Sequence, residues 1–392
     1  MRSMLLFSLA MLLCTSAHGA PAETARGEYL TRAGNCAGCH TAPGGQPFAG
    51  GRAIDSSFGT FYAPNITADT STGIGDWSAD QFWSALHQGQ RADGSLLYPA
   101  CPYPNFTQVR RDDVDAIYAY LRSLPAVQQA NREHELSFPA SSRALLSVWQ
   151  WLYFEPGTFE PDPAQSAEGN RGAYLVEGLG HCSACHAERN GLGAVRTGEA
   201  VRGSTVHAWY APSLHSSAEA GVQKWTPEQA ADLLRYGKAG DASALGPMAD
   251  VVFESLQYLS EDDALAMATY LQSLPDYDIE ARRRPSISQE RLEAARQLGG
   301  TVYEKNCVDC HGADGEGSET APALAGNRAV TMSDQTNLRN IIRHGGYPAS
   351  TEANPRPLGM PPFYKLSSKE FEAVVTYIRS SWGNRPAEDG GR

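Results

Sequence analysis

Three copies of one five-residue motif are the strongest chemical signal in this sequence of 392 residues. Each copy reads C-x-x-C-H, at residues 36–40, 182–186 and 307–311. Two thiols at this spacing can form thioether bonds to the two vinyl groups of one porphyrin, and the adjacent histidine can bind the iron from the proximal side. The motif therefore predicts covalent c-type haem. The predicted attachment residues are Cys36, Cys39, Cys182, Cys185, Cys307 and Cys310. The predicted proximal iron ligands are His40, His186 and His311.

A zinc site is the main structural alternative for such cysteine pairs. It would need two pairs that converge on one ion. Here the pairs lie more than a hundred residues apart, and each has its own histidine. The sequence therefore predicts three covalent haems, one for each motif.

The sixth ligand of a low-spin electron-transfer haem is usually Met or His. Met248 and Met360 lie 62 and 49 residues after the histidine of their motifs, each in a proline-containing loop. We predict that these two methionines bind iron. Met267 and Met332 are weaker candidates, because Met267 falls on the packed face of a predicted helix and Met332 lies too early in its repeat.

The first repeat contains no methionine, and Cys101 stands where one would be expected, 61 residues after His40. Three alternatives follow. Cys101 binds the iron as a thiolate, which we favour because a metal readily stabilises a thiolate. His87 or His134 binds instead. Or the iron is five-coordinate, and Cys101 only packs.

The motifs belong to a repeated helical unit. Residues 26–30 and 171–175 share the pattern R-G-x-Y-L before the first two motifs, and residues 295–298 are the looser third copy. Ser78 and Thr226, each with Gln three residues later, predict the start of a middle helix. An amphipathic helix closes each unit, and Ser367 with Glu370 predicts a capping box at the start of the third such helix. A proline carbonyl after each motif could accept the second N–H of the proximal imidazole, although an ordinary loop proline is equally consistent.

This pattern predicts an all-α fold of three tandem c-type cytochrome domains with long loops and linkers. The predicted boundaries are 1–20 for a signal peptide, 23–125 for domain 1, 126–165 for a linker with an apolar helix, 166–276 for domain 2, 277–290 for a second linker and 291–384 for domain 3. We call the three domains the first, second and third unit.

Composition and targeting signals indicate an exported acidic protein. The formal net charge is −12, and no basic patch points to nucleic acid. Arg2 followed by the apolar residues 4–13 is typical of a signal peptide, which predicts a periplasmic location. Residues 145–154 are apolar on nearly every face, yet only about half the length that spanning needs. We expect this segment to lie at a membrane surface or in a groove of a partner, or else to fill the cleft between the first two units.

The sequence resembles the tri-haem cytochrome c subunit of bacterial membrane-bound dehydrogenases over about residues 27–382. The most specific stretches are residues 62–67, 98–104, 159–163 and 170–175. The resemblance implies periplasmic electron transfer from a catalytic subunit of quinoprotein, flavoprotein or molybdenum type. It also implies transfer through three haems to ubiquinone or a terminal oxidase, with peripheral contact to the inner membrane. The chain departs from the family at Cys101, where relatives have Met, and in its short tail after Trp382, which lacks their membrane-associating extension.

The predicted function is therefore that of an electron-transfer subunit with no substrate chemistry of its own. Nothing in the sequence forms a nucleophile–base pair or a second cofactor site. The alternative is a haem enzyme that uses a Cys101-ligated haem in the first unit to oxidise small sulfur compounds.

Overall fold

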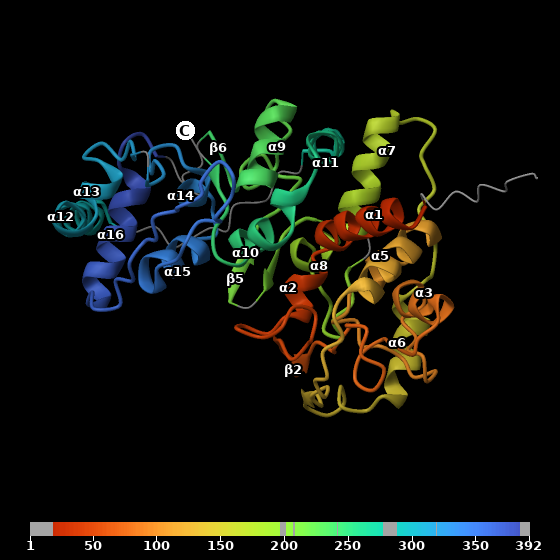
Figure 1. Cartoon of the computed structure of the whole chain (residues 1–392). Helices are drawn as coiled ribbons and strands as arrows, with labels where there is room; N and C mark the ends of the chain where they lie inside the picture. Colours follow the sequence, from red (N-terminus) through yellow and green to blue (C-terminus); the bar gives the residue numbers. More distant parts are fainter. Residues whose placement is uncertain are drawn as a thin grey trace, which may run out of the picture.

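The computed structural model describes residues 19–196, 201–206, 208–240, 242–276, 288–318 and 320–384. The third unit lies at one end of the molecule, the second in the middle and the first at the other end (Figure 1). In each unit, the helix before the motif packs against the helix that closes the unit. Most of the predicted signal peptide and most of the linker 277–290 lie outside the described residues.

The helices and strands follow the three repeats. The first unit contains α1 (Gly19–Ala33), α2 (Cys36–His40), β1 (Ala53–Ser56), β2 (Gly59–Tyr62), α3 (Ala79–His87), α4 (Tyr103–Phe106) and α5 (Arg111–Ser123). The linker adds β3 (Glu135–Leu136) and α6 (Ala144–Tyr153). The second unit contains α7 (Ala167–Ala173), η1 (Tyr174–Leu179), α8 (Ser183–His186), β4 (Ser204–Val206), β5 (Trp209–Ala211), α9 (Pro227–Tyr236), β6 (Lys238–Ala239), β7 (Ala242–Ser243), α10 (Pro247–Glu254), η2 (Leu256–Tyr258) and α11 (Glu261–Ser273). The third unit contains α12 (Gln289–Asn306), α13 (Val308–His311), α14 (Arg328–Thr331), α15 (Thr336–His344) and α16 (Ser368–Ser380).

A glycine lies at the crossing of the first and last helix in every unit. A β-carbon at Gly27, Gly172 or Gly299 would come within 2.2 Å or less of a backbone carbonyl oxygen on the closing helix. The same β-carbon would also meet Tyr120, Tyr270 or Tyr377, so these three tyrosines occupy equivalent positions.

The crossing also corrects the sequence alignment of the third repeat. Gly299 is the counterpart of Gly27 and Gly172, so placing residues 295–298 opposite the R-G-x-Y-L pattern is wrong. The looser composition of that copy hid its glycine, because neither Arg nor Tyr marks the position.

The second unit accommodates an extra residue before its motif. The first cysteine follows the crossing glycine by nine, ten and eight residues in the three units. In the second unit, α7 continues directly into the π-helical turn η1, which ends at Leu179. A π-turn absorbs an additional residue without ending the helix. The chain can therefore deliver Cys182 to a position equivalent to that of Cys36.

The predicted capping signals are confirmed. Capping boxes form at Ser78 with Gln81, at Thr226 with Gln229 and at Ser367 with Glu370. The second of these helices, α9, ends at Gly237 in the left-handed conformation, which glycine adopts without steric cost.

Small antiparallel sheets accompany the helices and were not predicted. In the described residues the strand orders are β1-β2-β3, β4-β5 and β6-β7. Gly59 pairs with Leu136, so the linker packs back on the first unit. The hairpins β1-β2 and β4-β5 lead into Pro64 and Pro212.

The buried side chains of the first two units form one continuous cluster, which also includes Ala349 of the third unit. A second cluster lies within the third unit. A small third cluster joins Leu146 of α6 to Phe61 and Tyr98 of the first unit. The first two units therefore share a core.

Candidate functional site

Each motif histidine is held in the same way. The Nδ1–H of His40 donates to the carbonyl oxygen of Pro64 at 2.7 Å, and that of His186 donates to Pro212 at 2.7 Å. In the third unit, His311 donates to Pro322 at 2.9 Å. This confirms the predicted proline contact in all three units. The bond fixes the ring orientation and leaves Nε2 open to bind an iron.

Burial keeps these imidazoles neutral. It lowers the pKa of His40, His186 and His311, although the proline carbonyl acts in the opposite direction. A neutral imidazole keeps the lone pair that a metal ligand needs.

The cysteine pairs lie on, or directly before, the short helices that carry the histidines. Burial raises the pKa of Cys36 and Cys182 to about 12 and that of Cys307 to about 11. Neutral, buried sulfur atoms suit thioethers to a porphyrin better than they suit thiolates on an ion. The residues present therefore fit covalent haem.

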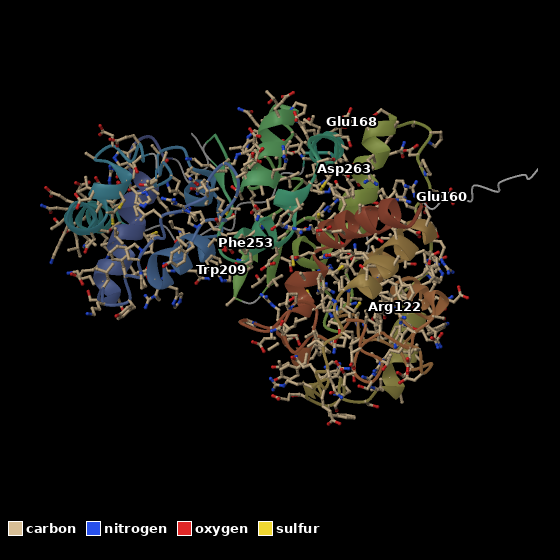
Figure 2. The ribbon with its side chains drawn as sticks, viewed as in Figure 1. Arg122, Glu160, Glu168, Trp209, Phe253 and Asp263 are labelled. Carbon is tan, nitrogen blue, oxygen red and sulfur yellow. The ribbon has the colours of Figure 1, made fainter. Side chains whose placement is uncertain are left out.

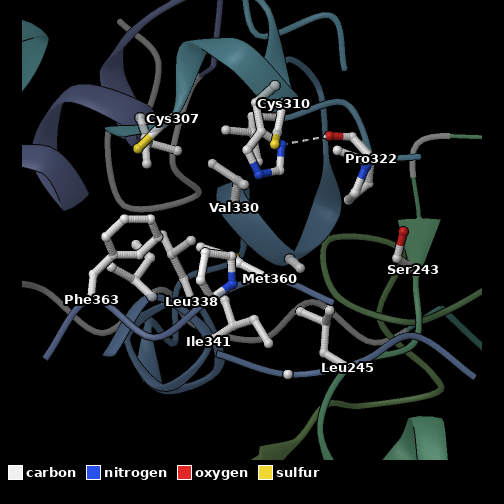
Figure 3. A pocket seen from close by; sticks show the side chains of 18 of the residues that line it. Ser243, Leu245, Cys307, Cys310, Pro322, Val330, Leu338, Ile341, Met360 and Phe363 are labelled. Carbon is white, nitrogen blue, oxygen red and sulfur yellow. Dashed lines mark hydrogen bonds between the residues drawn. The ribbon is translucent and has the colours of Figure 1, made fainter. Parts of the chain in front are cut away.

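An apolar cavity in the third unit is built for such a group. Figure 3 shows Cys307, Cys310 and Pro322 along one side of it and Met360 across from them. Its walls include Val330, Leu338, Ile341 and Phe363. Backbone hydrogen bonds in both directions between Gly346 and Met360 hold the loop that carries the methionine. The structure thus brings together the attachment residues and the predicted sixth ligand of this unit.

The predicted ligand of the second unit lies at the first turn of α10. Met248 follows Pro247 and is partly buried against the shared core of the first two units. Its rival Met267 is only 1% exposed inside the core, as predicted from the helix face. Met332 is also buried, at 5%, where its carbonyl oxygen accepts a hydrogen bond from Arg379.

Cys101 is placed close to the first motif. Its thiol is near enough to interact electrostatically with Cys39, as it does with Cys36, and it packs on the same core cluster. Burial, and to a smaller extent Cys39, raises the pKa of Cys101 to about 12. Without an adjacent cation the sulfur would remain protonated, so a thiolate here requires the iron itself.

The two rival imidazoles of the first unit have other partners. His87 bonds through Nδ1 to the carbonyl oxygen of Thr107 at 2.8 Å and stacks on Trp83. His134 accepts a hydrogen bond from the backbone N–H of Tyr62 and packs against Phe61. The Nδ1 contact of His87 matches that of the motif histidines and leaves its Nε2 open, so it does not exclude His87 as a ligand. Cys101 lies beside the motif cysteines and stays our predicted ligand.

The haem-motif sites of neighbouring units lie next to each other. The thiols of Cys39 and Cys185 lie close enough to interact electrostatically, and α2 packs against α10. The cavity of the third unit is closed in part by Ser243, Leu245 and Gly246, which directly precede Met248 in the second unit. Sequence reasoning missed these bridging residues, since no motif marks them.

The apolar segment at 145–154 forms α6. It is partly packed against the first two units and partly exposed, so neither the predicted surface position nor the predicted cleft position describes it completely. It packs on the first unit through Leu146, and Trp149 donates to the carbonyl oxygen of Leu192 in the second. Its other face is exposed: Trp151 is 82% and Val148 50% accessible. Figure 1 shows α6 at the outer edge of the first unit.

The chain is similar to known cytochromes over most of its length. The cytochrome c family matches residues 24–125 and 297–382. The cytochrome c subunit of the quinone alcohol dehydrogenase of Gluconacetobacter polyoxogenes is 36% identical, over 92% of this chain and 80% of that protein. The gluconate 2-dehydrogenase cytochrome c subunit of Pantoea cypripedii is 37% identical, over 92% and 85%. The fructose dehydrogenase cytochrome subunit of Gluconobacter japonicus is 34% identical, over 92% and 80%.

Proposed function

We propose that this chain, which belongs to the family of cytochrome c subunits of bacterial dehydrogenases, passes electrons from a dehydrogenase catalytic subunit to ubiquinone or a terminal oxidase. It is an electron-transfer subunit with covalently bound haem c. Its relatives are named as cytochrome subunits of dehydrogenases, and the substrate chemistry belongs to a separate partner.

The proposed number of haems is three, one in each of three tandem, mainly helical cytochrome c units. Each haem, when bound, supplies a one-electron iron couple. The observation that carries this proposal is the repeated contact between a motif histidine and a proline carbonyl. Chance C-x-x-C-H sequences would not place an oriented imidazole beside paired cysteines three times.

Haem stoichiometry tests this proposal directly. The mature protein, expressed with the haem-attachment machinery, should carry three haems that survive acid–acetone extraction. Its mass should exceed that of the polypeptide by three haems. Two or fewer haems in a fully matured preparation would contradict the proposed count.

The proposed partner is a catalytic subunit of quinoprotein, flavoprotein or molybdenum type. Support comes from the relatives, which are named as cytochrome subunits of quinone alcohol, gluconate and fructose dehydrogenases. Purification of the tagged chain from its native host should bring this subunit with it. Adding the subunit's substrate should then reduce the haems, and a chain that purifies alone and stays oxidised would contradict the assignment.

The proposed location is the periplasm, with peripheral contact at the inner membrane. Support comes from the predicted signal peptide, most of which lies outside the described residues, and from the exposed apolar face of α6. Within the described residues, no helix has the length and apolar character needed to cross a membrane. Surface contact through α6 is therefore the form of attachment that we propose.

The alternative function is that of a sulfur-oxidising haem enzyme, and the residue that suggests it is Cys101. The comparisons do not favour it, because the relatives are electron-transfer subunits. Turnover of thiosulfate by the purified chain without any partner would support the alternative and contradict the carrier function.

A further inference from the structure

A reciprocal pair of tyrosine–aspartate hydrogen bonds joins the first two units. Tyr29 on α1 donates to Asp263 on α11 at 2.5 Å, which links the first unit to the second. Tyr174 on η1 donates to Asp113 on α5 at 2.5 Å, which links the second unit to the first. Each tyrosine comes two residues after the crossing glycine of its own unit. The two contacts are thus the same contact made twice, in opposite directions.

The surroundings of the two contacts also match. Each aspartate is the third residue of its closing helix, and each receives an arginine from its own unit. Arg171 reaches Asp263 with two bonds of 2.7 Å, and Arg26 reaches Asp113 at 2.5 Å. Each tyrosine hydroxyl also accepts a backbone N–H at the start of the other unit's closing helix, from Ser260 or Arg110. Figure 2 shows Asp263 on α11, beside α7 and α1.

Both aspartates and Tyr174 are buried, whereas Tyr29 is partly buried. Asp113 is 1% exposed, Asp263 8% and Tyr174 2%. A buried carboxylate needs charge-assisted hydrogen bonds on most of its lone pairs. One arginine from the same unit leaves room for a further donor, and the tyrosine of the other unit supplies it. Loss of either tyrosine hydroxyl while the units stay packed would therefore leave a buried carboxylate with one donor fewer.

The third unit keeps the aspartate position but not the contact. Glu370 is the third residue of α16, and it caps its own helix through Ser367. The positions of the arginine and tyrosine are taken by Leu298 and Thr301. The third unit instead binds the second through a two-way amide–backbone pair between Asn337 and Tyr210.

The reciprocal contact lies on the helices that deliver the first two motifs. Between them, Ser255 donates to the carbonyl oxygen of Ala33, and Asn105 donates to that of Glu177 and to Ser183. Helix α1 ends three residues before Cys36 and η1 ends three residues before Cys182, so each tyrosine lies close along the chain to its attachment cysteines.

We propose that Tyr29 and Tyr174 are positioning residues that lock the first two units into one rigid di-haem body and so set the separation of their haems. The third unit is joined to the second by different contacts. The inference rests on the proposed function in one respect only, that the first two motifs carry haem.

Pulsed electron spin resonance on the fully loaded, ferric chain tests the proposal, because it measures distances between haem irons. In the wild type, every inter-haem distance should be sharp. In the double variant Tyr29→Phe/Tyr174→Phe, distances that involve the first haem should lose their sharp peak, whereas the distance between the second and third haems should not change. The single variants should broaden the same distances less, and they provide the test if the double variant does not fold.

Tyr303→Phe is the matched control. Tyr303 is buried on α12, and its hydroxyl donates to Gly312 within the third unit at 2.7 Å. Its loss should lower the unfolding temperature without broadening distances to the first haem. Unchanged distances in the tyrosine variants, with or without a lower unfolding temperature, would overturn the inference and leave the proposed function intact. A wild-type chain without haem in the first two units would instead overturn the proposed function.

Discussion

Gly27 on α1 lies so close to α5 that a β-carbon at residue 27 would come within 2.0 Å of the carbonyl oxygen of Ala116. This contact is with backbone and cannot be relieved by a side-chain rotation. Gly27→Ala should therefore separate the two helices of the first unit and lower its stability by about 1–3 kcal/mol or more.

Gly157→Ala is the control for that substitution, because a β-carbon at Gly157 meets nothing within 4 Å. It should leave the thermal unfolding of the loaded protein unchanged or raise it slightly. Equal unfolding temperatures for Gly27→Ala and wild type would mean that the helices can separate at no cost.

His186→Ala removes the imidazole that Pro212 orients. We expect the low-spin absorption of one haem to be lost, while the signals of the other two persist, because each motif has its own proline contact. Absorption and magnetic circular dichroism of the ferric and ferrous protein provide the measurement. Simultaneous loss of all three signals would contradict independent sites.

Cys101→Met should raise the reduction potential of the first haem. An anionic thiolate donates electron density and favours ferric iron, whereas a thioether favours ferrous iron. If Cys101 is the ligand, the first haem has the lowest potential in the wild type. Redox titrations followed by electron spin resonance measure the change. Identical titrations of wild type and variant would exclude Cys101 as a ligand and direct attention to His87 and His134.

The contact of Asp263 with Arg171 and Tyr29 should make stability depend on acid pH. Burial acts to raise the pKa of Asp263, but the hydrogen bonds from Arg171 and Tyr29 together outweigh it and hold the pKa below the usual 3.8. Because the folded pKa is the lower one, the stabilisation is fully present above about pH 4–5 and is lost as the pH falls through the folded value.

Asp263→Asn should accordingly lower the free energy of unfolding by about 2 kcal/mol near neutral pH. The difference in this free energy between variant and wild type should shrink as the pH falls below 3.8. Chemical unfolding of both proteins across a pH series measures this. Asp262→Asn, an exposed neighbour in the same helical turn, is the control and should change little. A difference that stays constant with pH would show that the carboxylate charge does not matter.

Trp151→Glu should weaken binding to phosphatidylcholine vesicles roughly tenfold or more, since it removes a large apolar side chain from the proposed contact face. Trp151 is 82% exposed on α6. Tyr364→Ser, at a 64% exposed aromatic in the third unit, should leave binding unchanged. Vesicle flotation gives the bound fraction. A wild type that does not float would favour a partner subunit as the occupant of this face.

Features that depend on neighbours along the chain could be predicted. The capping boxes at Ser78, Thr226 and Ser367 need only residues three apart, and each is found where expected. The proline contacts reach 11 to 26 residues and were foreseen as one of two alternatives. The third crossing glycine was misplaced, because its repeat lacks the arginine and tyrosine that mark the other two.

The haem motifs and their histidines were determined by the sequence alone, because the chemistry of attachment is contained in five consecutive residues. Tertiary structure decided the rest. Tyr29 and Asp263 are 234 residues apart, and their pairing depends on how two folded units bury charge against each other. Likewise, tertiary packing decides that Leu146 is buried and Trp151 on the same helix is exposed. The hydrophobic pattern predicts that a helix has apolar faces. Which of those faces becomes buried depends on the shape of the neighbouring protein surface.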